Sequence, residues 1–281
     1  MILPKGFQFS QSSLQDYVDC PRRFLLRHVR QLPWPAVESE PALDNERYTQ
    51  RGKIFHKMIQ QHLIGIPEKR IASIATHDEL ENWWQNYLEF YRQQNIAQQH
   101  AWFPEIVLKA PLSSYSLIAA FDLIVHQVND TLVIYDWKTN HSRPSRLWLE
   151  RRLQTRVYPY LLAKAGNFLL GGRLIQPENI RMVYWFAAFP SQPETFVYDT
   201  LAFTTDEKYL ENLVETIEQR QENDFFLTDD NRYCQYCVYR SLCERGIQAG
   251  CMDNNAEIDL PHGLDDEEAR FDFDQISEIA F

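Results

Sequence analysis

Two neighbouring stretches, residues 116–128 and 131–139, are apolar runs of β-favouring residues. Both are rich in Ile, Leu, Val, Phe and Tyr, which fit the half-buried surface of a sheet. Asn129 and Asp130 between them form a tight-turn signal, so the pair is expected to be a β-hairpin. Strand character also occurs at residues 102–110, 181–188 and 195–203.

Five other segments have the spacing of apolar residues that predicts helices. The first begins at Ser10, which is followed by Ser13 in a helix-start signal. In the fourth, Pro159 lies inside the helical pattern and indicates a kink. The predicted helices cover residues 7–31, 47–63, 78–99, 147–165 and 205–223.

Charged side chains interrupt the predicted hairpin at three positions. Asp122 lies in its first strand, and Asp136 and Lys138 lie near the end of its second. Successive strand residues point to opposite faces, so Asp136 and Lys138 share one face and Trp137 faces the other way. Burying such charges at the end of an apolar run costs free energy unless they are paired or bind a ligand. The plainest interpretation of Asp-x-Lys alone is a salt bridge at a strand end.

The chemistry that uses two carboxylates and a lysine in this arrangement is metal-assisted phosphodiester hydrolysis. Carboxylates on two strands are hard oxygen ligands that suit Mg²⁺ or Mn²⁺. The metal polarises the phosphoryl oxygen and activates a bound water. A neighbouring lysine can stabilise the developing charge or orient that water.

With two further motifs, the chain resembles the PD-(D/E)XK nuclease superfamily, and within it the RecB-like branch. These motifs are Arg51-Gly52-Lys-Ile-Phe-His56, before the hairpin, and Gln154-Thr-Arg-Val-Tyr158, after it. The order His, Asp, Asp-x-Lys, Gln-x-x-x-Tyr is that of the branch. The resemblance implies an α/β (α+β) fold with a restriction-endonuclease-like core, in which helices flank a mixed central sheet.

The resemblance also implies roles for individual residues. The metal ligands would be His56, Asp122, Asp136 and the backbone carbonyl of Trp137. Asp122, Asp136 and Lys138 would form the catalytic set. Gln154 and Tyr158 would contact DNA and brace the site, and aromatic side chains such as Tyr158 and Tyr160 could stack on bases. Glu105, in the strand before the hairpin, is a candidate for an extra acidic residue or an ordinary surface residue.

Four of the five cysteines form a second group with metal-binding character. Cys234-x-x-Cys237-x5-Cys243 lies more than 200 residues after Cys20, and Cys251 is most simply a free thiol. A signal peptide and a membrane-length apolar run are both lacking, which predicts a cytoplasmic protein without structural disulfides. Four thiolates can hold zinc or a [4Fe–4S] cluster. The one-plus-three spacing resembles the iron–sulfur staple of RecB-like nucleases, which implies the cluster and joined N- and C-terminal segments.

The charge of the chain is unevenly distributed. The whole chain carries −11, but residues 249–281 contribute ten acidic groups and one Arg, a net −9 that leaves −2 for the rest. From Lys138 to Lys164 the local charge is +6, which predicts a phosphate-binding strip including Arg151 and Arg156. A solvated helix face is the alternative. These features divide the chain into one nuclease domain, residues 1–248, and an acidic C-terminal tail, residues 249–281.

Taken together, the sequence predicts a metal-dependent DNA nuclease. No helicase signature is present, so single-stranded DNA or frayed DNA ends are the expected substrates, with exonuclease action. The expected setting is DNA repair and recombination or CRISPR adaptation, with a helicase or CRISPR adaptation proteins as partners. An inactive DNA-binding scaffold subunit and a zinc-stapled RNA-processing nuclease are the alternatives.

Overall fold

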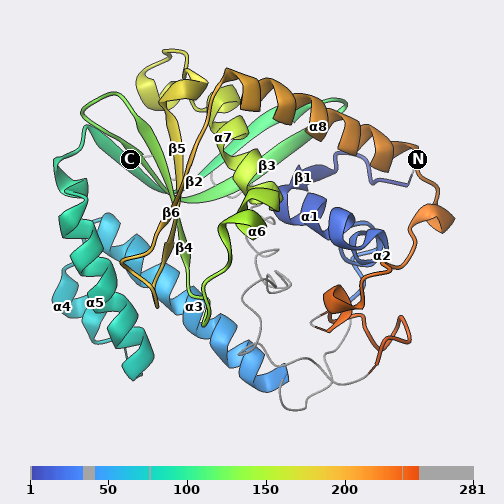
Figure 1. The fold of residues 1–281 in the computed structure, drawn as a ribbon, viewed down its shortest axis with the longest axis horizontal. Coiled ribbons are helices and arrows are strands. Elements are labelled where there is room, and N and C mark those ends of the chain that lie inside the picture. Colours follow the sequence, from blue (N-terminus) through green and yellow to red (C-terminus); the bar gives the residue numbers. More distant parts are fainter. Residues whose placement is uncertain (1, 34–41, 76, 236, 247–281) are drawn as a thin grey trace, which may run out of the picture.

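A six-stranded mixed sheet forms the centre of the computed structural model, which describes residues 2–33, 42–75, 77–235 and 237–246 (Figure 1). The strands follow the order β1-β3-β4-β5-β6, and β2 pairs with β3 outside this path. Pairing is parallel for β1 with β3 and β4 with β5, and antiparallel elsewhere. The strands are β1 Gln8–Ser10, β2 Ala101–Leu112, β3 Tyr115–His126, β4 Leu132–Lys138, β5 Ile180–Phe186 and β6 Glu194–Val197.

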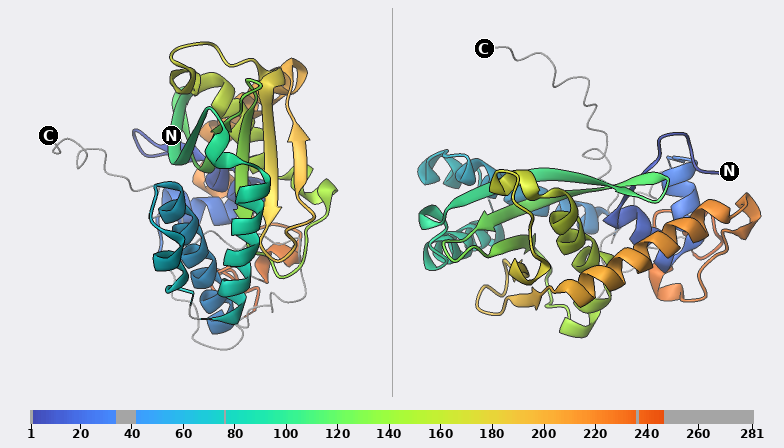
Figure 2. Two further views of the ribbon diagram at one scale, coloured as in Figure 1. Left: turned by 90° about the vertical axis from the view of Figure 1, so that its left-hand side faces the viewer. Right: turned by 90° about the horizontal axis from the view of Figure 1, so that it is seen from above.

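Helices cover both faces of this sheet (Figure 2). On one face α7 and α8 enclose a core with the N-terminal helices, and on the other α3 and α5 enclose an aromatic-rich core. This arrangement confirms the expected mixed sheet flanked by helices. The helices are α1 Gln11–Asp19, α2 Pro21–Phe24, α3 Ala42–Leu63, α4 Glu68–Ala72, α5 Asp78–Gln93, α6 Arg146–Arg151, α7 Leu153–Ala165 and α8 Thr200–Gln219. A π-helical turn covers Leu25–Val29, and 3₁₀ turns cover Ile96–Gln98, Asn167–Leu170, Pro177–Asn179, Glu222–Asp224 and Asn231–Cys234.

The N-terminal segment differs from the single helix predicted for residues 7–31. Residues 8–10 form β1, and Ser10 then caps α1 by accepting a hydrogen bond from the Ser13 amide, as the helix-start signal indicated. The helix ends at Cys20, whose backbone is extended (φ −161°, ψ 103°). The following Pro21 explains the break, because a residue before proline is disfavoured in helical conformation.

The predicted helix over residues 147–165 is also broken. It divides into α6 and α7 at Arg152, whose backbone is extended with ψ 138°. Pro159 is tolerated within α7, downstream of the break. The predicted strand 195–203 was too long, because Asp199 accepts a hydrogen bond from the Ala202 amide and begins α8.

The predicted hairpin is confirmed as β3 and β4. Asp130 in the connecting turn has φ 66°, a left-handed conformation that Asp tolerates better than most residues. On the α5 side of β4, Trp137 is buried beside Tyr135 and Trp185. The opposite side of β4 carries Asp136, so the hairpin places an aromatic layer directly behind the charged residues.

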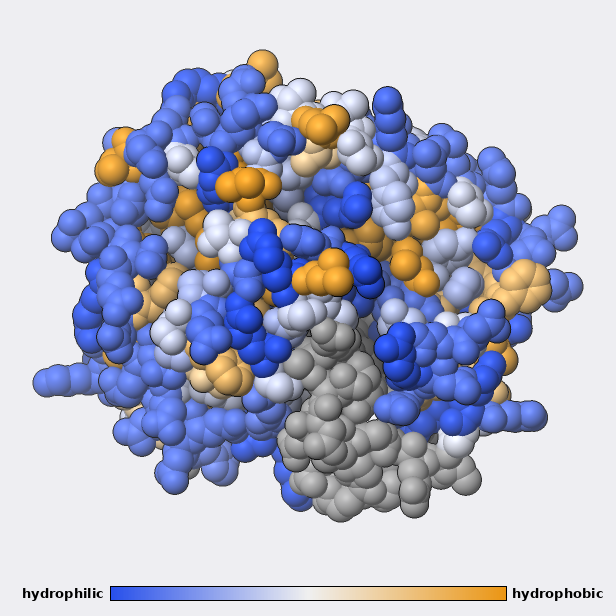
Figure 3. All heavy atoms as spheres, in the orientation of Figure 1, coloured by the Kyte–Doolittle hydropathy of each residue, from blue (hydrophilic) through white to orange (hydrophobic). Residues whose placement is uncertain are grey.

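The face of the molecule seen in Figure 3 is mostly hydrophilic, with apolar side chains scattered among polar ones. That surface agrees with the negative mean hydropathy of the chain, −0.44. Within the described residues, every helix is too short or too polar to cross a membrane. The acidic tail, residues 249–281, and Cys251 lie outside the described residues.

Candidate active site and cysteine pocket

The hairpin register brings the two predicted carboxylates together. Leu123 pairs with Tyr135 across the antiparallel strands, so Asp122 lies opposite Asp136 at the next position. The Trp137 amide donates to Asp122 Oδ2 at 2.8 Å. Asp136 is only 3% exposed. Both carboxylates therefore lie where the pairing of β3 with β4 ends. A side chain from a third element can reach them there.

Helix α7 supplies that third element through Gln154. Its Nε2 donates to Asp136 Oδ1 at 2.5 Å, and its Oε1 accepts from Lys138 Nζ at 3.0 Å. Lys138 Nζ also lies 2.9 Å from Asp136 Oδ2. One carboxamide thus holds both ends of the Asp-x-Lys pair. The salt bridge that was the plainest interpretation of the motif exists, but as part of a larger array.

Helix α3 brings His56 to the same place. His56 Nδ1 lies 3.3 Å from Asp122 Oδ1. The helix approaches the end of β4 closely at Gly52, where a Cβ would lie 3.0 Å from Thr139 Oγ1. Because Gly52 has no side chain, α3 can pack close to the end of β4, and this packing places His56 beside Asp122.

Burial and neighbouring charges shift the pKa values of two site residues. Burial raises the pKa of Asp136 to about 6, although Lys138 opposes the shift. Burial alone would lower the pKa of His56, but Asp122 and Glu105 outweigh it and raise that pKa to about 9. Without a bound cation the imidazolium neutralises part of the carboxylate charge, which a divalent metal would otherwise do.

Glu105 is the fourth acidic or imidazole group near the site. It lies in β2 between two residues paired with β3, Pro104 with Leu123 and Ile106 with Phe121, so in this continuous register it lies opposite Asp122. Its φ is 49°, an unusual conformation for a residue with a side chain. From this position opposite Asp122, its charge helps to raise the His56 pKa.

The donor set suits a hard divalent cation. Asp122 and Asp136 offer carboxylate oxygens, His56 offers an imidazole nitrogen, and the buried Asp136 Oδ2 is paired with Lys138. Within the described residues, however, no group of three or more His, Cys, Asp or Glu side chains is already arranged to hold a metal. Hydrogen bonds from Gln154 and the Trp137 amide hold Asp136 Oδ1 and Asp122 Oδ2 in their present positions.

The other predicted DNA-contacting residues occupy two kinds of environment. Tyr158 is 7% exposed and packs on Phe121, with ring centroids 4.7 Å apart, and Tyr160 is 1% exposed. Tyr158 lies against the carboxylates, which raise its pKa together with burial. Both rings therefore lie in the core, where Tyr158 can brace the site but offers no open face to a base. Arg151 is exposed at the end of α6.

The arginines of the predicted phosphate-binding strip are largely paired with carboxylates. Arg156 donates to Asp206 Oδ1 at 2.8 Å, and Arg146 to Glu194 Oε2 at the same distance. Arg143 also pairs with Glu194, and Lys164 with Glu207 at 2.6 Å. These partners offset much of the local charge of +6 that the sequence shows.

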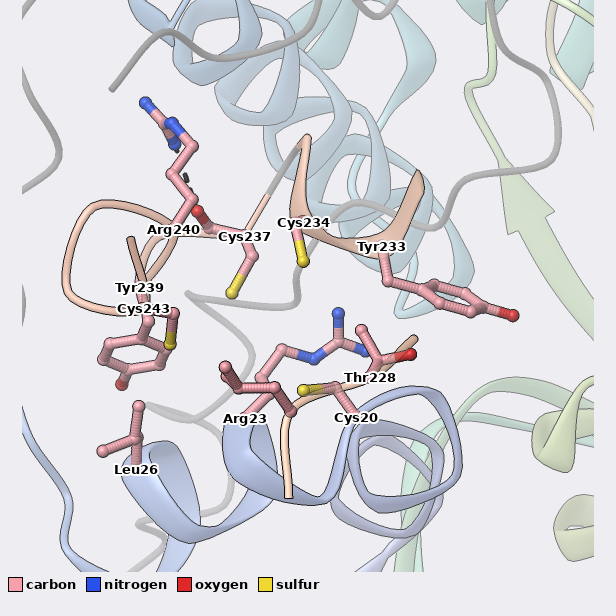
Figure 4. Close-up of a pocket in the computed structure, with 11 residues that line it drawn as sticks. Cys20, Arg23, Leu26, Thr228, Tyr233, Cys234, Cys237, Tyr239, Arg240 and Cys243 are labelled. Carbon is pink, nitrogen blue, oxygen red and sulfur yellow. Dashed lines mark hydrogen bonds between the residues drawn. The ribbon is translucent and has the colours of Figure 1, made fainter. Parts of the chain in front are cut away.

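The four predicted cluster cysteines line one small cavity of about 20 Å³ (Figure 4). Cys20 comes from the end of α1 and the other three from the segment after α8, so the cavity joins the two ends of the described chain. All four are free thiols, and Cys20 and Cys237 are each 8% exposed. Arg23 extends into the same cavity.

The cavity has the donors for a thiolate-bound metal, but burial keeps three of the four thiols protonated. Burial raises the pKa values of Cys234 and Cys237, and that of Cys243 to about 11, so these thiols are neutral at pH 7. Metal binding would deprotonate them. In the part of the chain that the structure describes, the cysteines therefore do not form a preorganised metal site.

Comparison with known proteins places this geometry in a family. The family model of the PD-(D/E)XK nuclease superfamily matches residues 8–244, which include the site residues and the four cysteines. The crystal structure of SSO0001 is 15% identical with a TM-score of 0.40, covering 86% of this chain and 87% of that one. That of a “Putative exonuclease” from Eubacterium rectale is 8% identical with a TM-score of 0.47, covering 76% and 81%. A search of curated proteins finds no match.

Proposed function

The chain belongs to the PD-(D/E)XK nuclease superfamily of phosphodiester-cleaving hydrolases, and from that membership we propose that it is a metal-dependent DNA nuclease. We further propose that it acts as an exonuclease on single-stranded DNA or frayed DNA ends. The observation that carries this proposal is the single carboxamide of Gln154, which binds both Asp136 and Lys138. A scaffold subunit would not need a buried, hydrogen-bonded Asp-x-Lys pair.

The proposed roles follow from the positions of the side chains. His56, Asp122 and Asp136 would hold Mg²⁺ or Mn²⁺, with the Trp137 carbonyl as a further ligand. The bound cation would supply Lewis-acid polarisation of the phosphoryl oxygen and an activated water. Lys138, oriented by Gln154, would stabilise the charge that develops on the phosphate. Arg151, which is exposed, would contact the DNA backbone.

We propose that the cysteine pocket holds a [4Fe–4S] cluster, as in the RecB-like branch. The convergence of Cys20, Cys234, Cys237 and Cys243 on one cavity supports four-thiolate ligation. Structural zinc is the rival occupant, since four thiolates also suit that ion. The cluster would join residues from both ends of a single nuclease domain, residues 1–248. A helicase or the CRISPR adaptation proteins would deliver the DNA.

The decisive experiment is a cleavage assay on end-labelled single-stranded DNA, double-stranded DNA and RNA, with Mg²⁺, Mn²⁺ or EDTA. We expect cleavage of single-stranded DNA that requires the metal and is lost in Asp136→Ala and Lys138→Ala. The matched control is Lys69→Ala, which removes an exposed lysine of α4 outside the site and should cleave normally. Full activity in both site variants would overturn the assignment, whereas preference for RNA would favour the RNA-processing alternative.

A further inference from the structure

The break between α6 and α7 leaves the start of α7 dependent on another part of the chain. The first amide groups of a helix have no partner within the helix. Arg152, at the N-cap of α7, provides no side-chain hydrogen bond to them. Instead Gln15 from α1 accepts from the Leu153 amide at 2.9 Å, and both groups are buried. Helix α7 therefore begins on a residue that is 138 positions earlier in the sequence.

Gln15 is in turn held by Asp19, one turn later in α1. Gln15 Nε2 donates to Asp19 Oδ1 at 2.8 Å. Arg152 Nη1 lies 3.6 Å from Asp19 Oδ2, so the same carboxylate also attracts the residue at the helix break. The side chain of Asp19 is 6% exposed. In this buried setting, each of these contacts restrains its partner strongly.

Asp19 also contacts the wall of the cysteine pocket. Arg23 Nη2 donates to Asp19 Oδ2 at 2.9 Å, and Arg23 lines the cavity with the four cysteines. Asp19 directly precedes Cys20 in the chain, so the carboxylate and the first thiol are positioned by the same end of α1. A change in the charge or packing of the pocket would therefore act on Asp19 through both Arg23 and the backbone.

The other end of this network is the proposed catalytic pair. Gln154 directly follows Leu153, whose amide is held by Gln15. It is also the residue that binds Asp136 and Lys138. Buried polar contacts thus run from the cysteine pocket through Arg23, Asp19 and Gln15 to the first turn of α7.

We propose that Asp19 is a positioning residue that fixes the start of α7, and with it Gln154, and thereby couples the cysteine pocket to the catalytic Asp136. This inference rests on the proposed nuclease function only in naming that site catalytic. Asp16 provides the contrast. It is equally buried on α1 and also pairs with Arg23, but its other partners, Arg27 and His28, belong to the N-terminal helices.

The test compares Asp19→Asn with the matched control Asp16→Asn in the full-length protein, each with and without Cys237→Ser in the pocket. One readout is Mn²⁺ affinity of the catalytic site by electron paramagnetic resonance. The other is deuterium exchange of residues 153–158. We expect Asp19→Asn to weaken Mn²⁺ binding roughly tenfold and to accelerate exchange. Asp16→Asn, compared at a temperature where both variants are folded, should change Mn²⁺ affinity less than twofold.

The double variants separate coupling from general damage. Cys237→Ser should weaken Mn²⁺ binding in the wild type and in Asp16→Asn. It should weaken Mn²⁺ binding no further in Asp19→Asn, because that variant has already lost the contacts of Asp19 that link the pocket to α7. Equal effects of the two Asp variants, or additive effects of Cys237→Ser and Asp19→Asn, would overturn the proposal. If Asp19→Asn does not fold, Gln15→Met tests the same path while keeping the Asp19–Arg23 pair.

The outcome is independent of whether the protein cleaves DNA. Mn²⁺ binding and deuterium exchange require no substrate, so a coupled protein that cleaves nothing would overturn the nuclease proposal alone. Conversely, an active nuclease in which Asp19→Asn leaves exchange of α7 unchanged would overturn the positioning role alone.

Discussion

Replacing Gln154 with Met removes the carboxamide that joins Asp136 and Lys138 but keeps the length of the side chain. Two hydrogen bonds to charged groups are lost, at 2.5 and 3.0 Å. Such bonds contribute about 1.5–3 kcal/mol each. The lower figure applies here because Asp136 and Lys138 stay paired at 2.9 Å. If both bonds act in the transition state, the loss is ~3 kcal/mol, which corresponds to a roughly 100-fold lower kcat.

The assay is single-turnover cleavage of end-labelled single-stranded DNA at saturating Mn²⁺, so that the chemical step is measured. The matched control is Gln93→Met on α5, which removes a 2.9 Å hydrogen bond from another glutamine to a carboxylate, Glu89, on an exposed surface. That variant should cleave at the wild-type rate. A Gln154→Met protein that retains more than about a third of the wild-type rate would refute the idea that this carboxamide orients the lysine.

Three further predictions concern other parts of the chain. Gly52→Ala should push α3 away from β4 and displace His56, which should lower the Mn²⁺ affinity measured by calorimetry. A change in that affinity of less than twofold would argue that the close approach of α3 to β4 is not the reason for glycine at this position. Burial would raise the pKa of Asp16, but Arg23 and Arg27 hold it well below its ordinary value of 3.8. The Asp16 carboxylate therefore contributes its full stabilisation above about pH 4 and loses it as the pH falls further. The difference in Tm between wild type and Asp16→Asn should accordingly become smaller in acid. A Tm difference that stays constant from pH 7 to pH 2 would contradict this. Anaerobically purified protein should be brown with about four irons per chain, and Cys20→Ser should bleach it, whereas one zinc per chain in a colourless protein would establish the rival occupant.

The sequence was sufficient to predict the hairpin and the shared face of Asp136 and Lys138. Strand alternation is local, and so the two residues could be placed without knowing the rest of the fold. The position of His56 beside Asp122 could not be predicted in this way, because it depends on the close approach of α3 to Thr139. Only the resemblance to a family indicated it.

The breaks at Cys20 and Arg152 differ in whether the sequence could have indicated them. Pro21 is a local signal that could have ended the first helix. Nothing local marks Arg152, because the break there is stabilised by Gln15 and Asp19, which are far away in the sequence. The paired state of the arginines in the +6 segment was hidden for the same reason, since Glu194 and Asp206 come from later elements.

The aromatic layer behind β4 gives the protein a built-in spectroscopic reporter. Trp137 is 2% exposed, with its ring 5.8 Å from Trp185 at 84° and 5.7 Å from Tyr135. Rings fixed this closely in a chiral setting produce strong near-ultraviolet circular dichroism and exchange excitation energy. Because the amide of Trp137 itself donates to Asp122, we expect a cation that binds this carboxylate to alter the surroundings of the indole. Titration with Mg²⁺, which neither absorbs nor quenches, should then be visible in the intrinsic fluorescence without any added label.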